Sequence, residues 1–301
     1  MQRAFLFWLA RRIRTVGFAR LFQFADLIGF VMWTFLPRRR RETVERIAFH
    51  LNISEAEAAR LAKISFYNTA RSFLEIFLNN RFDSISIQIR DPELFHRLSQ
   101  TGQPGILATA HFGAWELEGA YLSQIAERPA LTVSRKQKNP AVSELIKELR
   151  REAELDTVDH RAAAGPALEC MRQGGVVGFL VDHNASRKEA VFLPFFNDVA
   201  AVNMGPAMLA IRAKALVYPS FLRRDGLRAY TLHLHEPLDT TTLEGTLPEK
   251  IRQVAAFYTR AVEEEVRQCP EQWFWMHNRW KTRPPEGEDS VHTKESPKNV
   301  V

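Results

Sequence analysis

Short apolar runs and longer segments with apolar residues at helical spacing follow one another along this chain. A short apolar run, or strict alternation with polar residues, is typical of a strand, whereas recurrence every three or four residues is typical of a helix. The predicted strands are residues 84–89, 106–110, 131–133, 176–181, 215–221 and 230–235. The predicted helices are residues 42–50, 54–80, 92–99, 114–126, 141–153 and 249–268.

The order of these elements predicts the fold class. From residue 106 onward strands and helices alternate, which favours an α/β fold with a largely parallel central sheet flanked by helices. The strand at residues 230–235 alternates cleanly between apolar and polar side chains. We therefore expect it at an edge of the sheet, with one face open to water.

The N-terminal segment predicts a membrane-anchoring helix. Apolar runs at residues 5–10 and 21–36 are separated and followed by arginines. Trp8 lies within the first run and Trp33 within the second. The longer run would extend about 24 Å as a helix, less than a hydrocarbon core of about 30 Å, and it carries Asp26. We expect an interfacial or shallowly embedded anchor, and two basic flanks favour the cytoplasmic face. The alternative is a helix that packs on the folded domain.

Composition sets the domain organisation. A chain of 301 residues with 46% hydrophobic content can bury the core of one large α/β domain. We expect an anchor with its basic flank at residues 1–41, a folded domain at 42–284, and a tail at 285–301. The tail is rich in Pro, Glu, Lys and Ser and holds almost nothing apolar, so we expect it to be disordered.

Cysteine usage and charge exclude several classes of protein. Cys170 and Cys269 are too few for a disulfide framework and lie outside any C-x2-C cluster, so a reducing compartment is the simpler assumption. The formal charge of +6 favours anionic partners such as lipid head groups or an acidic carrier protein. No zinc finger, recognition helix or aromatic RNA-binding signature is evident, and we expect no nucleic-acid partner.

His111 and Glu116 are the first candidates for chemistry. His111 follows the apolar run 106–110, and Glu116 falls in the first turn of the next predicted helix. An imidazole titrates near neutrality, and a carboxylate beside it can orient the ring and stabilise the imidazolium, which suits a general base. The alternative is structural, with Glu116 complementing the helix dipole and His111 as an ordinary strand-end residue.

Further polar residues follow other strands. Asp182 and His183 come directly after the strand 176–181, and ligands of such sheets usually bind outside the carboxyl ends of the strands. A cleft shared with His111 is one interpretation; a turn residue and a surface residue are the other. Basic residues that could hold an anionic group are Arg135, Lys136, Lys138, Arg150 and Arg151, although most are expected on a solvated face.

Four blocks of this sequence together resemble the lipid A biosynthesis acyltransferases, the lauroyl or myristoyl transferases of the lysophospholipid acyltransferase superfamily. They are residues 108–116, residues 134–140, residues 181–184 with 191–196, and residues 275–284. The resemblance extends from the N-terminal anchor to about Pro284, which makes residues 42–284 the acyltransferase domain.

The resemblance implies a reaction and a site. His111 would be the base and Glu116 its partner in the H-x4-E element, Arg135 and Arg150 would bind anionic substrate, and Asp182 would belong to the active site. The acyl donor would be an acyl carrier protein thioester and the acceptor a hydroxyl or hydroxyacyl group of a lipid A precursor. No cofactor or metal is implied, and the protein would work at the cytoplasmic face of the bacterial inner membrane.

The resemblance also bears on two aromatic clusters. Phe192, Phe195 and Phe196 could line a groove for the acyl chain near the anchor, or belong to the core. The tryptophans Trp273, Trp275 and Trp280 could meet lipid head groups, or cap the sheet.

One departure from the family pattern concerns the acceptor. Lys136 follows Arg135 where the lipid A enzymes usually have proline, so another glycolipid or a lysophospholipid is an alternative acceptor. Two other classes are a non-catalytic membrane-surface binding protein and a metal-dependent hydrolase with His111, Glu116, Asp182 and His183 as ligands.

Overall fold

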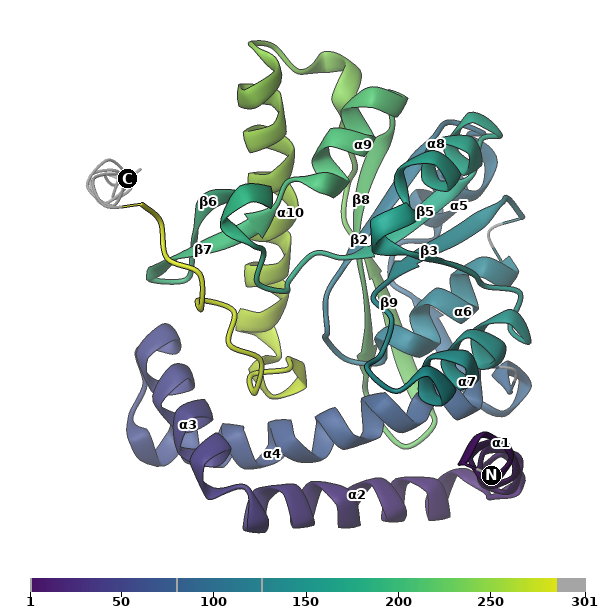
Figure 1. Ribbon diagram of the computed structural model, residues 1–301, viewed down its shortest axis with the longest axis vertical. Helices are drawn as coiled ribbons and strands as arrows, with labels where there is room; N and C mark the ends of the chain where they lie inside the picture. The colour runs from purple at the N-terminus through teal and green to yellow at the C-terminus, as the bar shows by residue number, and fades with distance from the viewer. Residues whose placement is uncertain (1, 80, 126, 286–301) are drawn as a thin grey trace.

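The computed structural model describes residues 2–79, 81–125 and 127–285 and has an α/β fold (Figure 1). One sheet has the strand order β1-β9-β8-β2-β5-β3-β4, and β10 pairs with β8. The strands are β1 Ser86–Ile89, β2 Gly105–Thr109, β3 Ala130–Ser134, β4 Asp156–Asp159, β5 Val176–Leu180, β8 Leu216–Arg224, β9 Ala229–Leu234 and β10 Leu238–Asp239. In the described part of this sheet, the antiparallel pairs are β8–β9 and β8–β10 and the other pairs are parallel, which confirms the prediction of a largely parallel sheet.

Helices cover both faces of this sheet because the central strands are apolar on both sides. In β2, Ile106 and Ala108 pack in the core cluster with side chains from α8, α9 and α10, whereas Leu107 packs in the opposite cluster with α5 and α6. The helices are α5 Pro92–Gln100, α6 Trp115–Ile125, α7 Pro140–Arg151, α8 Ala164–Arg172, α9 Gly205–Ala213 and α10 Leu247–Gln268. A continuous apolar strand covered on both sides is the usual arrangement in parallel sheets.

Four helices precede the sheet. They are α1 Gln2–Thr15, α2 Phe18–Phe35, α3 Pro37–Leu51 and α4 Glu55–Leu74, and Ser54 caps α4 by accepting a hydrogen bond from Glu57 N–H at 3.2 Å. Helices α2 and α4 lie side by side along one edge of the molecule (Figure 1). Short 3-10 helices occupy Glu75–Leu78, Phe82–Ser84, His160–Ala162, Arg187–Glu189, Thr240–Thr242 and Pro270–Gln272.

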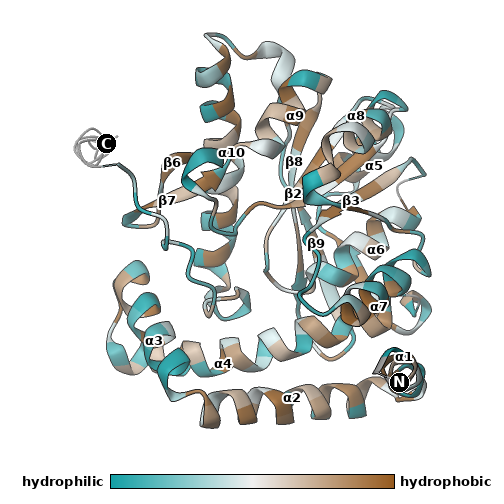
Figure 2. Ribbon diagram, in the orientation of Figure 1, coloured by the Kyte–Doolittle hydropathy of each residue, from teal (hydrophilic) through white to brown (hydrophobic). Residues whose placement is uncertain are grey.

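Helix α2 has one packed face and one exposed apolar face. Asp26 and Gly29 face α4, where Asp26 forms an ion pair with Arg71 at 2.7 Å. The exposed side chains are Phe24, Leu27, Phe30, Val31 and Phe35, and Figure 2 shows α2 as largely hydrophobic at the margin of the molecule. Within the described residues, α2 is the one helix whose length and hydropathy would allow it to cross a membrane. One face of α2 thus packs on the folded part of the protein, as the second sequence-based alternative predicted, and the exposed apolar face makes α2 a candidate membrane anchor.

The strand predicted at the edge of the sheet lies inside it. β9 pairs with β8 on one side and runs parallel to β1 on the other. Tyr230, Leu232 and His233 are buried, so the edge-strand prediction was wrong. The outer edge of β9 is paired with β1, from much earlier in the chain, and the polar side chains His233 and His235 lie near Glu265 of α10.

Several elements had no clear signal in the sequence. The hairpin of β6 Ala190–Phe195 and β7 Asp198–Asn203, the strand β4 and the helices α8 and α9 were not predicted. Residues 286–301 lie outside the described residues, and with them nearly all of the tail that was expected to be disordered.

Candidate active site

His111 and Asp182 meet at the carboxyl edge of the sheet. His111 follows β2 and Asp182 follows β5, and these strands are parallel neighbours. Asp182 Oδ1 lies 2.9 Å from His111 Nδ1, and Asp182 Oδ2 accepts the backbone N–H of His111 at 3.0 Å. Trp273 Nε1 donates a third hydrogen bond to Oδ2 at 2.8 Å. The Asp182 side chain is only 3% exposed, so these donors replace the water that the carboxylate has lost.

This contact determines the tautomer of the imidazole. Because Asp182 accepts at Nδ1, the proton of a neutral His111 ring belongs on Nδ1, and Nε2 is left as the basic nitrogen. Nε2 forms no hydrogen bond with the described residues, and the side chain is 25% exposed. The ring can therefore accept a proton from a molecule that enters the site.

The charges around the pair shift both pKa values. Burial alone would lower the pKa of His111, but the Asp182 carboxylate and its hydrogen bond, with a contribution from Glu116, raise it above its ordinary value. Burial opposes ionisation of Asp182, yet the imidazole and the Trp273 indole hold the pKa of that carboxyl well below its usual range. Asp182 consequently remains ionised at neutral pH and steadies an imidazolium.

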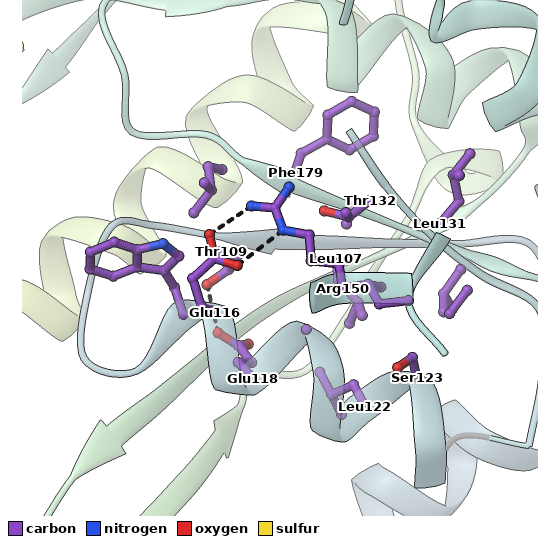
Figure 3. Close-up of a pocket in the computed structure, with 17 residues that line it drawn as sticks. Leu107, Thr109, Glu116, Glu118, Leu122, Ser123, Leu131, Thr132, Arg150 and Phe179 are labelled. Atoms are coloured by element: carbon purple, nitrogen blue, oxygen red, sulfur yellow. Dashed lines mark hydrogen bonds and ion pairs between the residues drawn. The ribbon is translucent and has the colours of Figure 1, made fainter. Parts of the chain in front are cut away.

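The orienting carboxylate is Asp182, and the assignment of that contact to Glu116 was wrong. Both oxygens of Glu116 accept from Arg150 of α7, Oε2 from Nε at 3.0 Å and Oε1 from Nη2 at 2.6 Å (Figure 3). From the first turn of α6 the Glu116 side chain is directed to α7, so the H-x4-E spacing does not produce a hydrogen bond with the imidazole.

Two of the predicted arginines have different surroundings. Arg150 is 8% exposed and its pKa is raised, because the Glu116 charge and hydrogen bonds outweigh the effect of burial. Arg135 is exposed in the loop after β3 and makes no hydrogen bond or ion pair with the described residues. Arg135 shares the carboxyl edge of the sheet with His111 and Asp182 but is not brought into contact with them.

The backbone around His111 is held at every position. We call residues 111–114 the His111 turn. His111 C=O accepts from Phe274 N–H at 3.0 Å, Gly113 N–H donates to Gln272 C=O at 3.0 Å, and Ala114 N–H donates to Leu222 C=O at 2.8 Å. Gly113 has a φ of +55°, and a Cβ there would lie 2.1 Å from Leu222 O. Only glycine fits this position.

The two aromatic clusters pack in the interior. Trp273, Trp275 and Trp280 are at most 5% exposed, which fits an element that caps the sheet and not side chains that meet head groups. Phe195 is buried and its ring centroid lies 5.7 Å from that of Trp273, so this phenylalanine belongs to the core. Sequence reasoning missed Trp273 as a partner of Asp182, because an indole donor leaves no spacing pattern.

A small, mainly apolar cavity of about 60 Å³ lies beside this site, between the sheet and helix α6 (Figure 3). The Glu116–Arg150 pair forms part of its wall. Its other lining residues include Leu107, Thr109, Trp115, Glu118, Leu122, Leu131, Leu155 and Phe179.

Glu118 adds no net charge to the cavity wall at neutral pH. It accepts hydrogen bonds from Thr109 Oγ1 at 2.9 Å and Ser220 Oγ at 2.6 Å. Burial raises the pKa of Glu118 to about 8, so the carboxyl group is mostly protonated near pH 7.

Two further histidines lie close to Asp182. His277 Nε2 accepts the backbone N–H of Asn184 at 3.1 Å, and burial lowers the pKa of His277 to about 4. Burial also lowers the pKa of His183, which follows Asp182 directly in the chain. In the described part of the chain, no group of three or more His, Cys, Asp or Glu side chains is placed to hold a metal ion. The metal-ligand set considered from the sequence is therefore not assembled there.

Comparison with known proteins places the chain among acyltransferases. A model of the bacterial lipid A biosynthesis acyltransferase family matches residues 3–282, and the chain belongs to this family. A lipid A biosynthesis acyltransferase of Haemophilus influenzae is 26% identical over 268 residues, which are 81% of this chain and 83% of that protein. A lipid A biosynthesis lauroyltransferase of Escherichia coli is 30% identical over 189 residues, 62% of this chain and 59% of the relative. The family resemblance seen in the sequence is thus confirmed.

A third relative covers a shorter part of the chain. It is a lipid A biosynthesis palmitoleoyltransferase of Escherichia coli, 32% identical over 124 residues, which are 40% of this chain and 38% of the relative.

Proposed function

We propose that this acyltransferase moves a fatty acyl chain from an acyl carrier protein thioester to a hydroxyl or hydroxyacyl group of a lipid A precursor, with His111 as the general base. The observation that carries the proposal is the hydrogen bond between Asp182 and His111 Nδ1, which leaves Nε2 basic and unpaired among the described residues. The family gives the reaction class and the lipid A acceptor.

The steps of the reaction balance with these groups. His111 Nε2 takes the proton of the acceptor hydroxyl, and the oxygen attacks the thioester carbonyl to give a tetrahedral oxyanion. The carbon–sulfur bond then breaks, the carbonyl re-forms as an ester, and the imidazolium returns its proton to the leaving thiolate. Asp182 remains ionised throughout and stabilises the imidazolium. Proton transfer by a positioned base such as His111 typically accelerates such reactions about 100-fold to 10,000-fold.

Arg150 and Glu116 have supporting roles in this proposal. The Arg150 charge acts on His111, so the guanidinium also lies within electrostatic reach of an oxyanion that forms beside the imidazole. Glu116 holds the guanidinium with two hydrogen bonds and so directs its remaining N–H groups. Arg135, exposed at the same edge of the sheet, would meet an anionic group of the incoming substrate.

The cavity beside Glu116 offers a place for the start of the donor acyl chain. Its wall is mainly apolar and Glu118 is mostly protonated near pH 7, so the transfer of methylene groups from water into the cavity is favourable. A volume of about 60 Å³ holds only a short part of a chain, so accommodating a longer one requires the surrounding side chains to move.

The exposed face of α2 supports work at a membrane. In the sequence α2 is flanked by the arginines of α1 and α3, which suits an anionic lipid surface at the cytoplasmic face of the inner membrane. We propose residues 1–41 as the anchor and residues 42–284 as the acyltransferase domain.

The test is transfer by the purified protein. Acyl carrier protein thioesters are incubated with lipid A precursors, other glycolipids and lysophospholipids, and the lipids are identified by mass spectrometry. We expect transfer to the lipid A precursor and a loss of at least about 100-fold in His111→Ala. His96→Ala is the control, since His96 is exposed on α5, which precedes the amino end of β2. Transfer by His111→Ala at the wild-type rate would overturn the proposed base, and transfer only to another lipid would overturn the acceptor.

A further inference from the structure

We propose that four polar residues position the His111 turn for the reaction. They are Arg224 at the end of β8 and, on one face of α4, Ser65, Asn68 and Ser72. This inference rests on the proposed function, because it takes the His111 turn as the place where transfer occurs. None of these four residues belongs to a motif that the sequence analysis singled out.

Arg224 connects the end of β8 to the His111 turn. Its Nε and Nη2 donate to the two oxygens of Glu75 at 2.7 and 2.6 Å, and Nη2 also lies 3.3 Å from Gly113 O. Tyr230 OH donates to Glu75 Oε1 at 2.9 Å. The Arg224 side chain is 4% exposed and that of Glu75 is 0% exposed, so the pair is removed from water.

Ser72 makes the shortest contact to the turn. Its Oγ lies 2.5 Å from Gly113 O and 2.9 Å from Asn68 O, and it accepts from Arg224 Nη2 at 2.9 Å. Gly113 O is therefore in contact with both a hydroxyl and a guanidinium group. Gly113 is also the residue of the turn with a φ of +55°. Two donors on this carbonyl restrict rotation of the peptide that follows Gly113.

The same face of α4 holds the segment on the other side of His111. Ser65 Oγ donates to Trp273 C=O at 2.8 Å, and Asn68 Nδ2 donates to Glu271 C=O at 2.9 Å. Positions 65, 68 and 72 lie on one face of a helix because they are separated by three and four residues. Trp273 in turn donates to Asp182, so α4 is connected to both ends of the His111–Asp182 pair.

The energetics of burial favour a positioning role. Removing two charges from water is expensive, and a buried ion pair is often no more stabilising than apolar residues of the same volume. Arg224 and Glu75 therefore need not be present for stability alone. The pair supplies a guanidinium whose N–H groups are directed at Gly113 O, Ser72 and Asn68. Apolar side chains could not supply these donors.

The neighbouring residue provides a matched control. Arg223 precedes Arg224 on β8 and also donates to a buried carboxylate, with its Nε 2.6 Å from Glu265 Oε1 on α10. Arg223 makes no hydrogen bond with residues 111–114. Arg223→Lys and Arg224→Lys thus disturb comparable ion pairs on one strand, and only the second touches the His111 turn.

The experiment compares kcat, KM and thermal midpoint for the full-length variants with acyl carrier protein thioester and lipid A precursor. In Arg224→Lys and Ser72→Ala we expect kcat to fall about 10-fold to 100-fold, because a displacement near 1 Å has effects of that size. KM for either substrate should change less than about twofold, since no substrate contact is removed. Arg223→Lys should keep kcat near the wild-type value even where its thermal midpoint falls equally.

A second pair of variants separates the hydroxyl from the packing around it. Ser72→Thr retains an Oγ and should recover most of the kcat that Ser72→Ala loses. Ser99→Ala is the matched control, because Ser99 Oγ donates to the carbonyl four residues earlier, as Ser72 Oγ can, but does not contact the turn. Ser99→Ala should have unchanged kcat.

The outcomes distinguish this inference from the proposed function. Equal kcat losses in Arg224→Lys and Arg223→Lys that follow the loss of thermal stability would overturn the positioning role. A rise in KM with kcat unchanged would also overturn it. Full activity of His111→Ala would instead count against the base, while a kcat loss specific to Arg224→Lys would still support a turn that must be held in place.

Discussion

At the scale of single residues, the proposed chemistry depends on two side chains that are 71 positions apart in the chain. Asp182 orients His111 Nδ1, and Glu116, only five positions from His111, instead holds Arg150. Proximity in sequence did not predict the carboxylate that contacts His111, because the Glu116 side chain in the first turn of α6 is directed to Arg150 and not to the imidazole. Adjacent parallel strands brought the distant carboxylate closer than the near one.

Replacement of Asp182 should change the pH dependence of transfer. The proposed base acts as neutral imidazole, and Asp182 raises the pKa of His111, so kcat/KM should rise with pH through an apparent pKa above 6.5. In Asp182→Asn the rising limb should move to lower pH, because the stabilising charge is gone while burial remains. The plateau rate should fall about 10-fold or more, since the imidazolium is less stable. A pH profile with an unmoved limb would contradict this role for Asp182.

Gly113 should tolerate no side chain. A Cβ at this position would lie 2.1 Å from Leu222 O in a backbone conformation that side chains rarely adopt. We expect Gly113→Ala to lose nearly all transfer and to be destabilised by about 1–3 kcal/mol, measured by chemical denaturation. Gly165→Ala is the control, since nothing lies within 4 Å of a Cβ there. Wild-type activity of Gly113→Ala would show that the turn adapts freely.

At the scale of elements, α4 is the link between the N-terminal helices and the sheet. Its Ser65, Asn68 and Ser72 face the His111 turn and the Trp273 segment, while Tyr67 and Arg71 face α2. Gly29 allows this close approach, because a Cβ there would lie 2.8 Å from Tyr67 Cα. The proposed anchor helix α2 and the proposed active site therefore both pack against α4.

The contact between α2 and α4 can be opened at Gly29. We expect Gly29→Leu to destabilise the protein by about 1–3 kcal/mol, because the backbone of α4 must move away from the added side chain. The measurement is urea denaturation in detergent. Gly17→Ala, at a position with nothing within 4 Å of a Cβ, should change stability much less. Equal stability of Gly29→Leu and the wild type would mean that the two helices separate without cost.

At the scale of the whole molecule, charge and apolar surface are combined at the N-terminal end. The exposed face of α2 is apolar, and the arginines of α1 and α3 lie on either side of it in the sequence (Figure 2). Interfacial binding gains from burying apolar area and from attraction to anionic lipids. The whole molecule would thus be oriented on the bilayer by this end.

Binding to vesicles should depend on the exposed face of α2. Phe30 is 51% exposed there, and Phe30→Ser should weaken binding to vesicles containing anionic lipid about 10-fold, since burial of a phenylalanine contributes about 1.5–3 kcal/mol. Leu247→Ser is the control, because Leu247 is 56% exposed at the start of α10, away from α2. Sedimentation with vesicles measures both. Equal binding of the two variants would place the membrane contact elsewhere.

Local pattern was sufficient for most of the central fold. The apolar runs predicted β2, β3, β5 and β8 closely, and helical spacing predicted α5, α6, α7 and α10, because each of these elements buries a continuous face. The strand β4 has only four residues, two of them aspartates, and Pro194 lies within β6, so neither segment has the pattern of a typical strand. The position of β9 inside the sheet depended on β1, which no local pattern reports.

By itself, the sequence determined the fold class, the family and the residues at the carboxyl ends of the strands, since periodicity and residue order express these directly. Only the tertiary structure decided that Asp182 contacts His111 and accepts from Trp273, that Glu116 pairs with Arg150, and that Arg224 and α4 contact the turn. These contacts join segments that are far apart in the chain. Their geometry depends on strand order and on the direction of each side chain, which arise when the sheet and its helices pack together.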